Sequence, residues 1–174
     1  MTTQKTIVIV SGFFDPIGIQ HIILFQEAAK LGDHLIVGVN SDECGLMKKG
    51  QPCFMPYKDR AFICENLKMV DEVVGFEDSD GSACQLIQDV YNKYEEGVNN
   101  GNIKIIFANG GDRAPDQEAC PEQKYIDKNL TNKVELVYGV GGFHKAGSSS
   151  TYLREWVNNT CSRYNIDFKL VKKY

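Results

Sequence analysis

Five short aliphatic runs, each rich in isoleucine and valine, recur along the chain at residues 6–10, 35–39, 72–76, 103–108 and 134–140. The runs are nearly continuous and lack the alternation of a half-exposed strand, a pattern typical of strands covered on both faces. The longer amphipathic stretches between them predict helices over residues 21–31, 57–68 and 84–94. This alternation predicts an α/β fold, with helices wound on both sides of a parallel sheet of about five strands.

The serines at 148–150 predict the start of a final helix, because hydroxyl side chains cap helix N-termini. Its spacing places Leu153, Trp156, Val157 and Cys161 on one buried face. No repeat or linker interrupts the pattern, so residues 1–174 are expected to form a single domain, with 165–174 as a possible C-terminal extension.

The chain has 174 residues, with 19 basic and 23 acidic side chains, and a formal net charge of −4. This balance argues against a nucleic-acid partner, so a bound anion must be held by a few local cations and backbone N–H groups. The N-terminal aliphatic run is too short for a signal peptide or a membrane span, which favours a cytoplasmic protein with no membrane partner. Six cysteines without a C-x-x-C pair are expected to be reduced thiols.

In a doubly wound sheet, ligands bind beyond the carboxyl ends of the strands. The segment directly after the first strand reads SGFFDPIGIQH over residues 11–21. Gly12 permits a tight turn there, and a helix beginning near His21 offers free N–H groups and a positive dipole end to a phosphate. We therefore expect a phosphate-binding loop at this position.

This loop resembles the G-x-F-D-x-x-H-x-G-H signature of the cytidylyltransferase-like nucleotidyltransferases. Other segments match the family in order: NSDE at 40–43, PYKDR at 56–60, VDEVV at 70–74, FANGGDR at 107–113 and GSSST at 147–151. The resemblance implies a Rossmann-like nucleotidyltransferase fold. It also implies transfer of a CMP group from CTP to a sugar or alditol phosphate, with release of pyrophosphate, Mg²⁺ as cofactor and a homodimer.

By the same resemblance, His21 contacts the nucleotide phosphates, either protonated or as an N–H donor. Lys48 or Lys49 holds the α-phosphate and the acceptor phosphate, and Asp42 and Arg60 face the acceptor. Asp112 is the expected Mg²⁺ ligand. The residues expected to bind the nucleotide are Gly12, Phe13, Phe14, Asp15, Gly18, Gln20, Gly110, Gly111, Asp112, Ser148, Ser149, Ser150 and Thr151.

Simpler structural interpretations stay open for several of these residues: turn capping for the aspartates, tight turning for the glycines, and N-capping for the serines. Two positions also depart from the signature. Gly18 stands where the family usually has its first histidine, and Gln20 replaces a glycine. Losing one preorganised donor typically costs about 3–4 kcal/mol of transition-state stabilisation. Two alternatives therefore remain: an ATP-using adenylyltransferase of the heptose-phosphate type, and a noncatalytic nucleotide-binding relative.

Overall fold

The central sheet follows the five aliphatic runs. The computed structural model describes residues 4–110, 120–142 and 149–164. Its strands are β1 (Lys5–Gly12), β2 (His34–Val39), β3 (Glu72–Gly75), β4 (Ile103–Gly110) and β5 (Val134–Val140). They pair in parallel in the order β3-β2-β1-β4-β5, which confirms the predicted Rossmann-like fold. The winding direction reverses between β1 and β4, and this reversal opens a crevice at their carboxyl ends.

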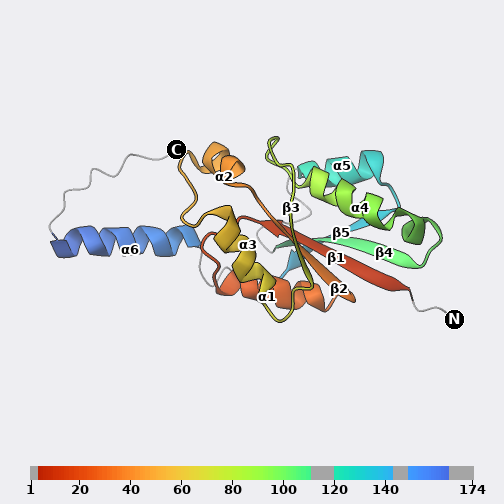
Figure 1. The fold of residues 1–174 in the computed structure, drawn as a ribbon, viewed down its shortest axis with the longest axis horizontal. Coiled ribbons are helices and arrows are strands. Elements are labelled where there is room, and N and C mark those ends of the chain that lie inside the picture. The colour runs from red at the N-terminus through yellow and green to blue at the C-terminus, as the bar shows by residue number, and fades with distance from the viewer. Residues whose placement is uncertain (1–3, 111–119, 143–148, 165–174) are drawn as a thin grey trace.

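Helices cover both faces of the sheet (Figure 1). The described residues form α1 (Ile19–Ala29), α2 (Asp42–Lys49), α3 (Tyr57–Glu65), α4 (Cys84–Asn99), α5 (Pro121–Asn129) and α6 (Ser149–Tyr164). Helices α1 and α3 lie on one face, and α4 and α5 lie on the other. None of the helices in the described part of the chain combines the length and apolar character needed to cross a lipid bilayer.

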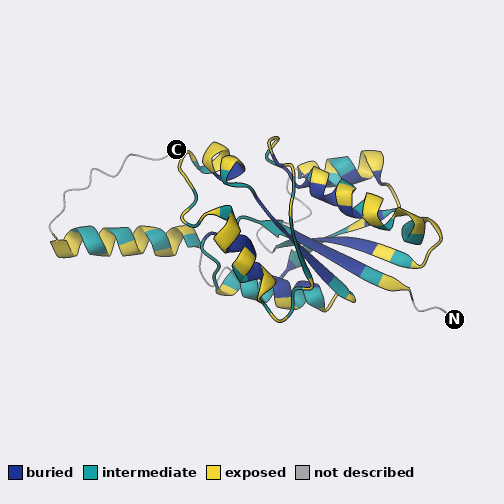
Figure 2. Cartoon of the chain, in the orientation of Figure 1, coloured by how far each residue is buried: buried dark blue, intermediate teal, exposed yellow. Residues whose placement is uncertain are grey.

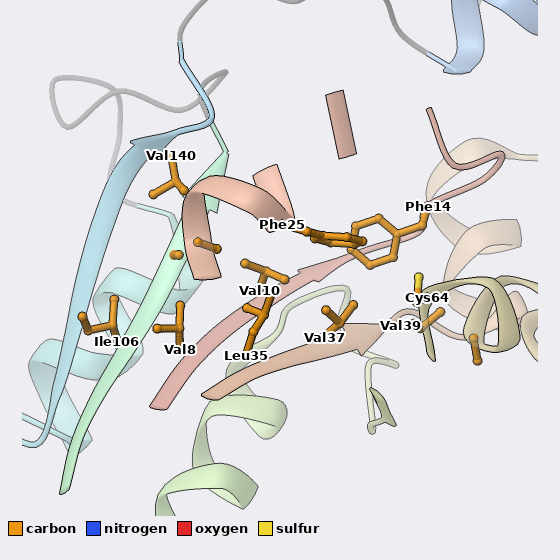
Figure 3. Packing of buried hydrophobic residues seen from close by; sticks show 13 residues of the cluster. Val8, Val10, Phe14, Phe25, Leu35, Val37, Val39, Cys64, Ile106 and Val140 are labelled. Carbon is orange, nitrogen blue, oxygen red and sulfur yellow. The ribbon is translucent and has the colours of Figure 1, made fainter. Parts of the chain in front are cut away.

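The aliphatic strands divide their side chains between two cores. On β1, Val8 and Val10 point toward Phe25 of α1 in one cluster (Figure 3), whereas Ile7 and Ile9 pack with residues of α4 in the other. All four β1 side chains are fully buried. A strand covered in this way needs apolar residues at successive positions, which explains the continuous runs in the sequence.

Two helices were not predicted from the sequence. Helix α2 contains the Lys48–Lys49 pair, although a lysine pair followed by glycine is by itself typical of a solvated loop. Gly45 lowers its helix propensity, but a Cβ there would lie 2.3 Å from Cys53 Sγ, so the close packing requires glycine. Helix α5 is largely polar, and its start is marked by Pro121.

The expected buried face of α6 is wrong. None of its described residues is buried, and Trp156 is 65% exposed. Figure 1 shows the reason: α6 projects away from the sheet instead of packing on it, and Figure 2 shows no buried colour along it. Phe62 of α3 is also 65% exposed, on the side of the helix opposite the buried Ala61 and Cys64.

A buried carboxylate joins the chain segments that follow β2 and β3. Asp78 accepts hydrogen bonds from Asn40 Nδ2 at 2.8 Å, from Ser41 N at 2.9 Å and from Ser41 Oγ at 2.6 Å. Burial by itself would raise the pKa of Asp78, but these hydrogen bonds hold the pKa below its ordinary value. Ser41 Oγ also accepts from Cys44 N and so caps α2. Asp78 therefore fixes where α2 begins.

We expect Asp78→Ala to lower the free energy of unfolding by about 3 kcal/mol. The hydrogen-bond donors of Asn40 and Ser41 would lose their acceptor at a buried site and stay unsatisfied. Urea denaturation measures the change. Asp89→Ala on α4, which removes an exposed carboxylate, is the control and should stay within about 0.5 kcal/mol of the parent. Equal effects of the two substitutions would contradict the role given to Asp78.

Candidate functional site

A cavity of about 280 Å³ lies at the carboxyl edge of the sheet, where β1, β4 and β5 end and α1 and α6 begin. This is the edge at which the sequence predicted a site. Its described lining consists of Phe13, Phe14, Asp15, Gly18, Ile19, Gln20, His21, Leu24, Lys49, Gly110, Val140, Gly141, Gly142, Ser149, Ser150 and Tyr152.

The loop from β1 to α1 is anchored by Phe14. This residue has a φ of 52°, and its ring turns back into the core, where it meets Phe25 at 4.9 Å between ring centroids (Figure 3). The ring also lies edge-on to His21, at 5.3 Å. A Cβ on Gly12 would lie only 2.9 Å from the Phe14 ring. Gly12 is thus required by this close approach.

His21 occupies the first turn of α1. Its Nδ1 accepts a hydrogen bond from Gly18 N at 3.0 Å, and its own backbone N–H donates to Gly18 O at 3.0 Å. Burial lowers the pKa of His21 below its ordinary value, and the positive charge of Lys49 lowers it further. The ring lies on the wall of the cavity.

Lys49 is the lysine among the described lining residues of the cavity. Its Nζ lies 3.3 Å from Asp15 Oδ2 and 4.6 Å from the centroid of the Phe13 ring, and its side chain keeps 30% exposure. Lys48 does not line this cavity. It lies against Gly81, where a Cβ would be 2.9 Å from Lys48 Cε. Of the two lysines that the sequence left open, the structure brings Lys49 to the cavity.

Asp15 lines the cavity, but its carboxylate is taken up by the chain. The side chain is 3% exposed and accepts from Phe54 N at 2.9 Å and from Met55 N at 2.8 Å, in addition to Lys49. It therefore ties the segment after α2 to the loop after β1. This matches the capping interpretation more closely than that of a direct ligand.

Two helix N-termini face the cavity. The described first turns of α1 and α6 contain no acidic residue, so their positive ends are not neutralised there. Ser149 Oγ donates to Pro16 O at 2.6 Å, so this hydroxyl joins α6 to the loop after β1 instead of pointing a free donor at a ligand. Ser150 lines the cavity, whereas Thr151 is exposed and does not.

Arg60 and Asp42, the expected acceptor-binding pair, do not line the cavity. Arg60 is fully buried and donates to Met55 O, to Phe13 O and to Asp42 Oδ1, at 3.0, 2.7 and 2.6 Å. Asp42 also accepts from Tyr57 N at 3.0 Å. Because the Arg60 side chain is fully buried, no part of it is exposed to a phosphate; this arrangement gives the pair a structural role and does not support contact with the acceptor.

Gly111, Asp112 and Ser148 lie outside the described residues. Within the described ranges, no cluster of three or more His, Cys, Asp or Glu side chains could hold a metal ion. Asp15, the one carboxylate among the described lining residues, already accepts two backbone N–H groups and Lys49. The described residues therefore do not by themselves form a Mg²⁺ site.

Several lining residues were missed by the sequence reasoning. Gly141 and Gly142 both have a φ of +86°, and a Cβ on Gly141 would lie 3.3 Å from the backbone of Leu24. A glycine pair directly after the last strand was a usable signal, because sites follow strands in this fold. Leu24 and Tyr152 carry no such signal, since only the positions of α1 and α6 in the fold bring them to the cavity.

Comparison with known proteins agrees with the fold. The similar solved structures include the lipopolysaccharide core biosynthesis protein of Thermoplasma volcanium, and a bifunctional NMN adenylyltransferase/ADP ribose pyrophosphatase of Francisella tularensis complexed with AMP and a Mn ion. The Thermoplasma protein has a TM-score of 0.56 and is 23% identical, and the match covers 77% of this chain and 95% of the Thermoplasma chain. The Francisella protein has a TM-score of 0.54 and is 14% identical, and the match covers 90% of this chain and 42% of the Francisella chain. At these identities the likeness establishes the fold.

Curated relatives match over shorter segments. The bifunctional protein HldE of a Nitratiruptor species is 44% identical over 75 residues, which are 42% of this chain and 16% of HldE. The FAD synthase of Pyrococcus horikoshii is 41% identical over 71 residues, which are 41% of this chain and 48% of the synthase. The matches thus span less than half the length of either relative.

The family model described as cytidylyltransferase-like matches residues 9–156, which include the second half of β1, the loop at the cavity, the other four strands and the first half of α6. The chain therefore belongs to the cytidylyltransferase-like family of nucleotidyltransferases.

Proposed function

We propose that this protein transfers a nucleotidyl group from a nucleoside triphosphate to a phosphorylated small molecule. An acceptor phosphate oxygen attacks the α-phosphorus, the bond from that phosphorus to the bridging oxygen breaks, and pyrophosphate leaves. The observation that carries the proposal is the cavity itself, which gathers His21, Lys49 and the N-termini of α1 and α6 at the switch point of the sheet.

This reaction needs positioning and charge neutralisation, because the acceptor phosphate is already a nucleophile. In the proposal, Lys49 neutralises charge on the α-phosphate and the acceptor phosphate, and the N–H groups at the start of α1 hold the other phosphates. His21 faces the leaving pyrophosphate as an N–H donor. These local groups supply the attraction that a net charge of −4 does not provide.

ATP is the nucleotide we propose first. The names of two similar proteins, FAD synthase and NMN adenylyltransferase, refer to adenine nucleotides. CTP, which the motif resemblance favoured, is the alternative donor. Mg²⁺ is proposed as the counter-ion of the triphosphate, since Mg²⁺ is commonly held by substrate phosphates and one or two carboxylates. A sugar or alditol phosphate acceptor, a homodimer and a cytoplasmic location stay predictions.

A noncatalytic nucleotide-binding protein is the second candidate, and Gly18 favours it. The backbone does not demand glycine here, because the φ of Gly18 is an ordinary −138° and a Cβ would meet only Ser149 Oγ, at 3.9 Å. A Cβ therefore has room at a position where the family usually carries histidine. The chain lacks this donor without a steric reason.

The first test is pyrophosphate release from ATP or CTP, with Mg²⁺ and a panel of sugar and alditol phosphates. We expect release with one donor and acceptor pair, loss of release with excess chelator, and an increase of about 10² in turnover in Gly18→His, which restores a donor. If no pair releases pyrophosphate in either protein although the nucleotide binds, the noncatalytic candidate is correct.

The second test compares neighbouring lysines. Lys49→Met should weaken triphosphate binding by about 10- to 100-fold, because a charged hydrogen bond to phosphate contributes roughly 1.5–3 kcal/mol. Lys48→Met is the matched control on the same helix and should change the affinity by less than about twofold. Calorimetric titration measures both, and a larger loss in Lys48→Met would reverse the assignment.

A further inference from the structure

We propose that His21 acts as a neutral imidazole that donates from Nε2, with its tautomer held by the main-chain N–H of Gly18. The inference rests on the proposed function and gives one of its residues a defined protonation state. The resemblance to the family left this open, since either a protonated ring or a neutral N–H donor would suit a phosphate.

The hydrogen bond between Gly18 and His21 determines the tautomer. A main-chain N–H always carries its hydrogen, so His21 Nδ1, 3.0 Å from Gly18 N, must present a lone pair. In a neutral ring the proton then sits on Nε2. Nε2 is accordingly the ring nitrogen that remains for a ligand of the cavity.

The surroundings oppose a charged ring. Protonation would place a hydrogen on Nδ1, facing the N–H of Gly18. Lys49 lines the same cavity with a positive charge, and the first turns of α1 and α6 add positive dipole ends without acidic residues. Asp15 is the carboxylate among the described lining residues, but it accepts from Lys49 and from two backbone N–H groups. Burial and Lys49 lower the pKa of His21, in agreement with this geometry.

A neutral donor has a specific chemical consequence. His21 would give a hydrogen bond to the pyrophosphate oxygen as the bond to the α-phosphorus breaks, and the proton would stay on Nε2. Pyrophosphate would leave as an anion, stabilised by this donor and the neighbouring positive groups. A protonated ring would instead be able to deliver a proton to the leaving group.

Two substitutions of His21 whose side chains, Gln and Glu, are nearly isosteric with each other separate these possibilities. In the first turn of a helix, Gln and Glu side chains both accept from the N-cap N–H, so His21→Gln and His21→Glu can each keep the bond to Gly18. Only Gln also donates. We expect Gln to keep turnover within about tenfold of the parent, and Glu and Ala to lose about 100-fold or more. Gln as inactive as Glu and Ala, with unchanged thermal unfolding, would overturn the proposal.

The pH profile provides a second readout. Turnover should stay constant from about pH 8 down to the ordinary histidine pKa of 6.5 and fall only at lower pH, where Nδ1 becomes protonated. The histidine-dependent part of this fall should vanish in His21→Gln. Turnover that increases as pH falls through 6.5 would identify the protonated ring as the active form and overturn the proposal.

Nitrogen NMR of the ¹⁵N-histidine-labelled protein tests the tautomer without any substrate. The His21 signals are those missing from His21→Gln. At about pH 7.5 we expect a directly bonded hydrogen on Nε2 and none on Nδ1, and a hydrogen on Nδ1 would overturn the inference. If no nucleotide releases pyrophosphate, the proposed function fails, and this spectrum still decides the tautomer.

Discussion

The packing of Phe14 into the core is the contact on which the site depends. Its ring is 2% exposed and lies against Phe25, so the chain leaving β1 must turn inward before α1 starts. That turn places His21 edge-on to the same ring and leaves room for no Cβ at Gly12. A loop held by a buried aromatic ring is preorganised, and preorganised donors are those that stabilise a transition state without reorganising.

Polar side chains around the cavity mostly bind the protein's own backbone. Asp15 accepts from two N–H groups of the segment before α3, Arg60 donates to the carbonyls of Phe13 and Met55, and Ser149 donates to the carbonyl of Pro16. A loop needs such partners because its backbone groups have no strand or helix to pair with. The cavity is thus formed by loops that are tied to one another, and Lys49 and His21 are positioned by these ties.

Electrostatics act locally in this protein. The chain carries a net charge of −4, yet the described cavity lining has one lysine, one histidine, two helix N-termini and one carboxylate that is already engaged. In a partly enclosed cavity such groups act over short distances and are screened less than surface charges. The overall charge therefore excludes a broad polyanion surface and says little about a single small anion.

The sequence by itself determined the sheet, because strands covered on both faces need continuous aliphatic runs, and all five runs became strands. It also located the cavity edge, since ligands of a doubly wound sheet bind where strands end and the motif residues Gly12, Phe14 and His21 lie at the end of β1 and after it. Helices α2 and α5 escaped prediction because Gly45 and a largely polar composition weaken their local signals.

The tertiary structure decided what each polar residue does. Lys48 and Lys49 are neighbouring residues of the same type, so the sequence does not distinguish their roles. Only the position of α2 in the fold brings Lys49 to the cavity. Arg60 and Asp42 resemble ligand residues in the sequence, but the fully buried Arg60 donates to Asp42 and to the backbone carbonyls of Phe13 and Met55. The physical reason is that a side chain's partner depends on which segments lie beside it in space. The hydrophobic pattern specifies strands and helices without specifying those neighbours.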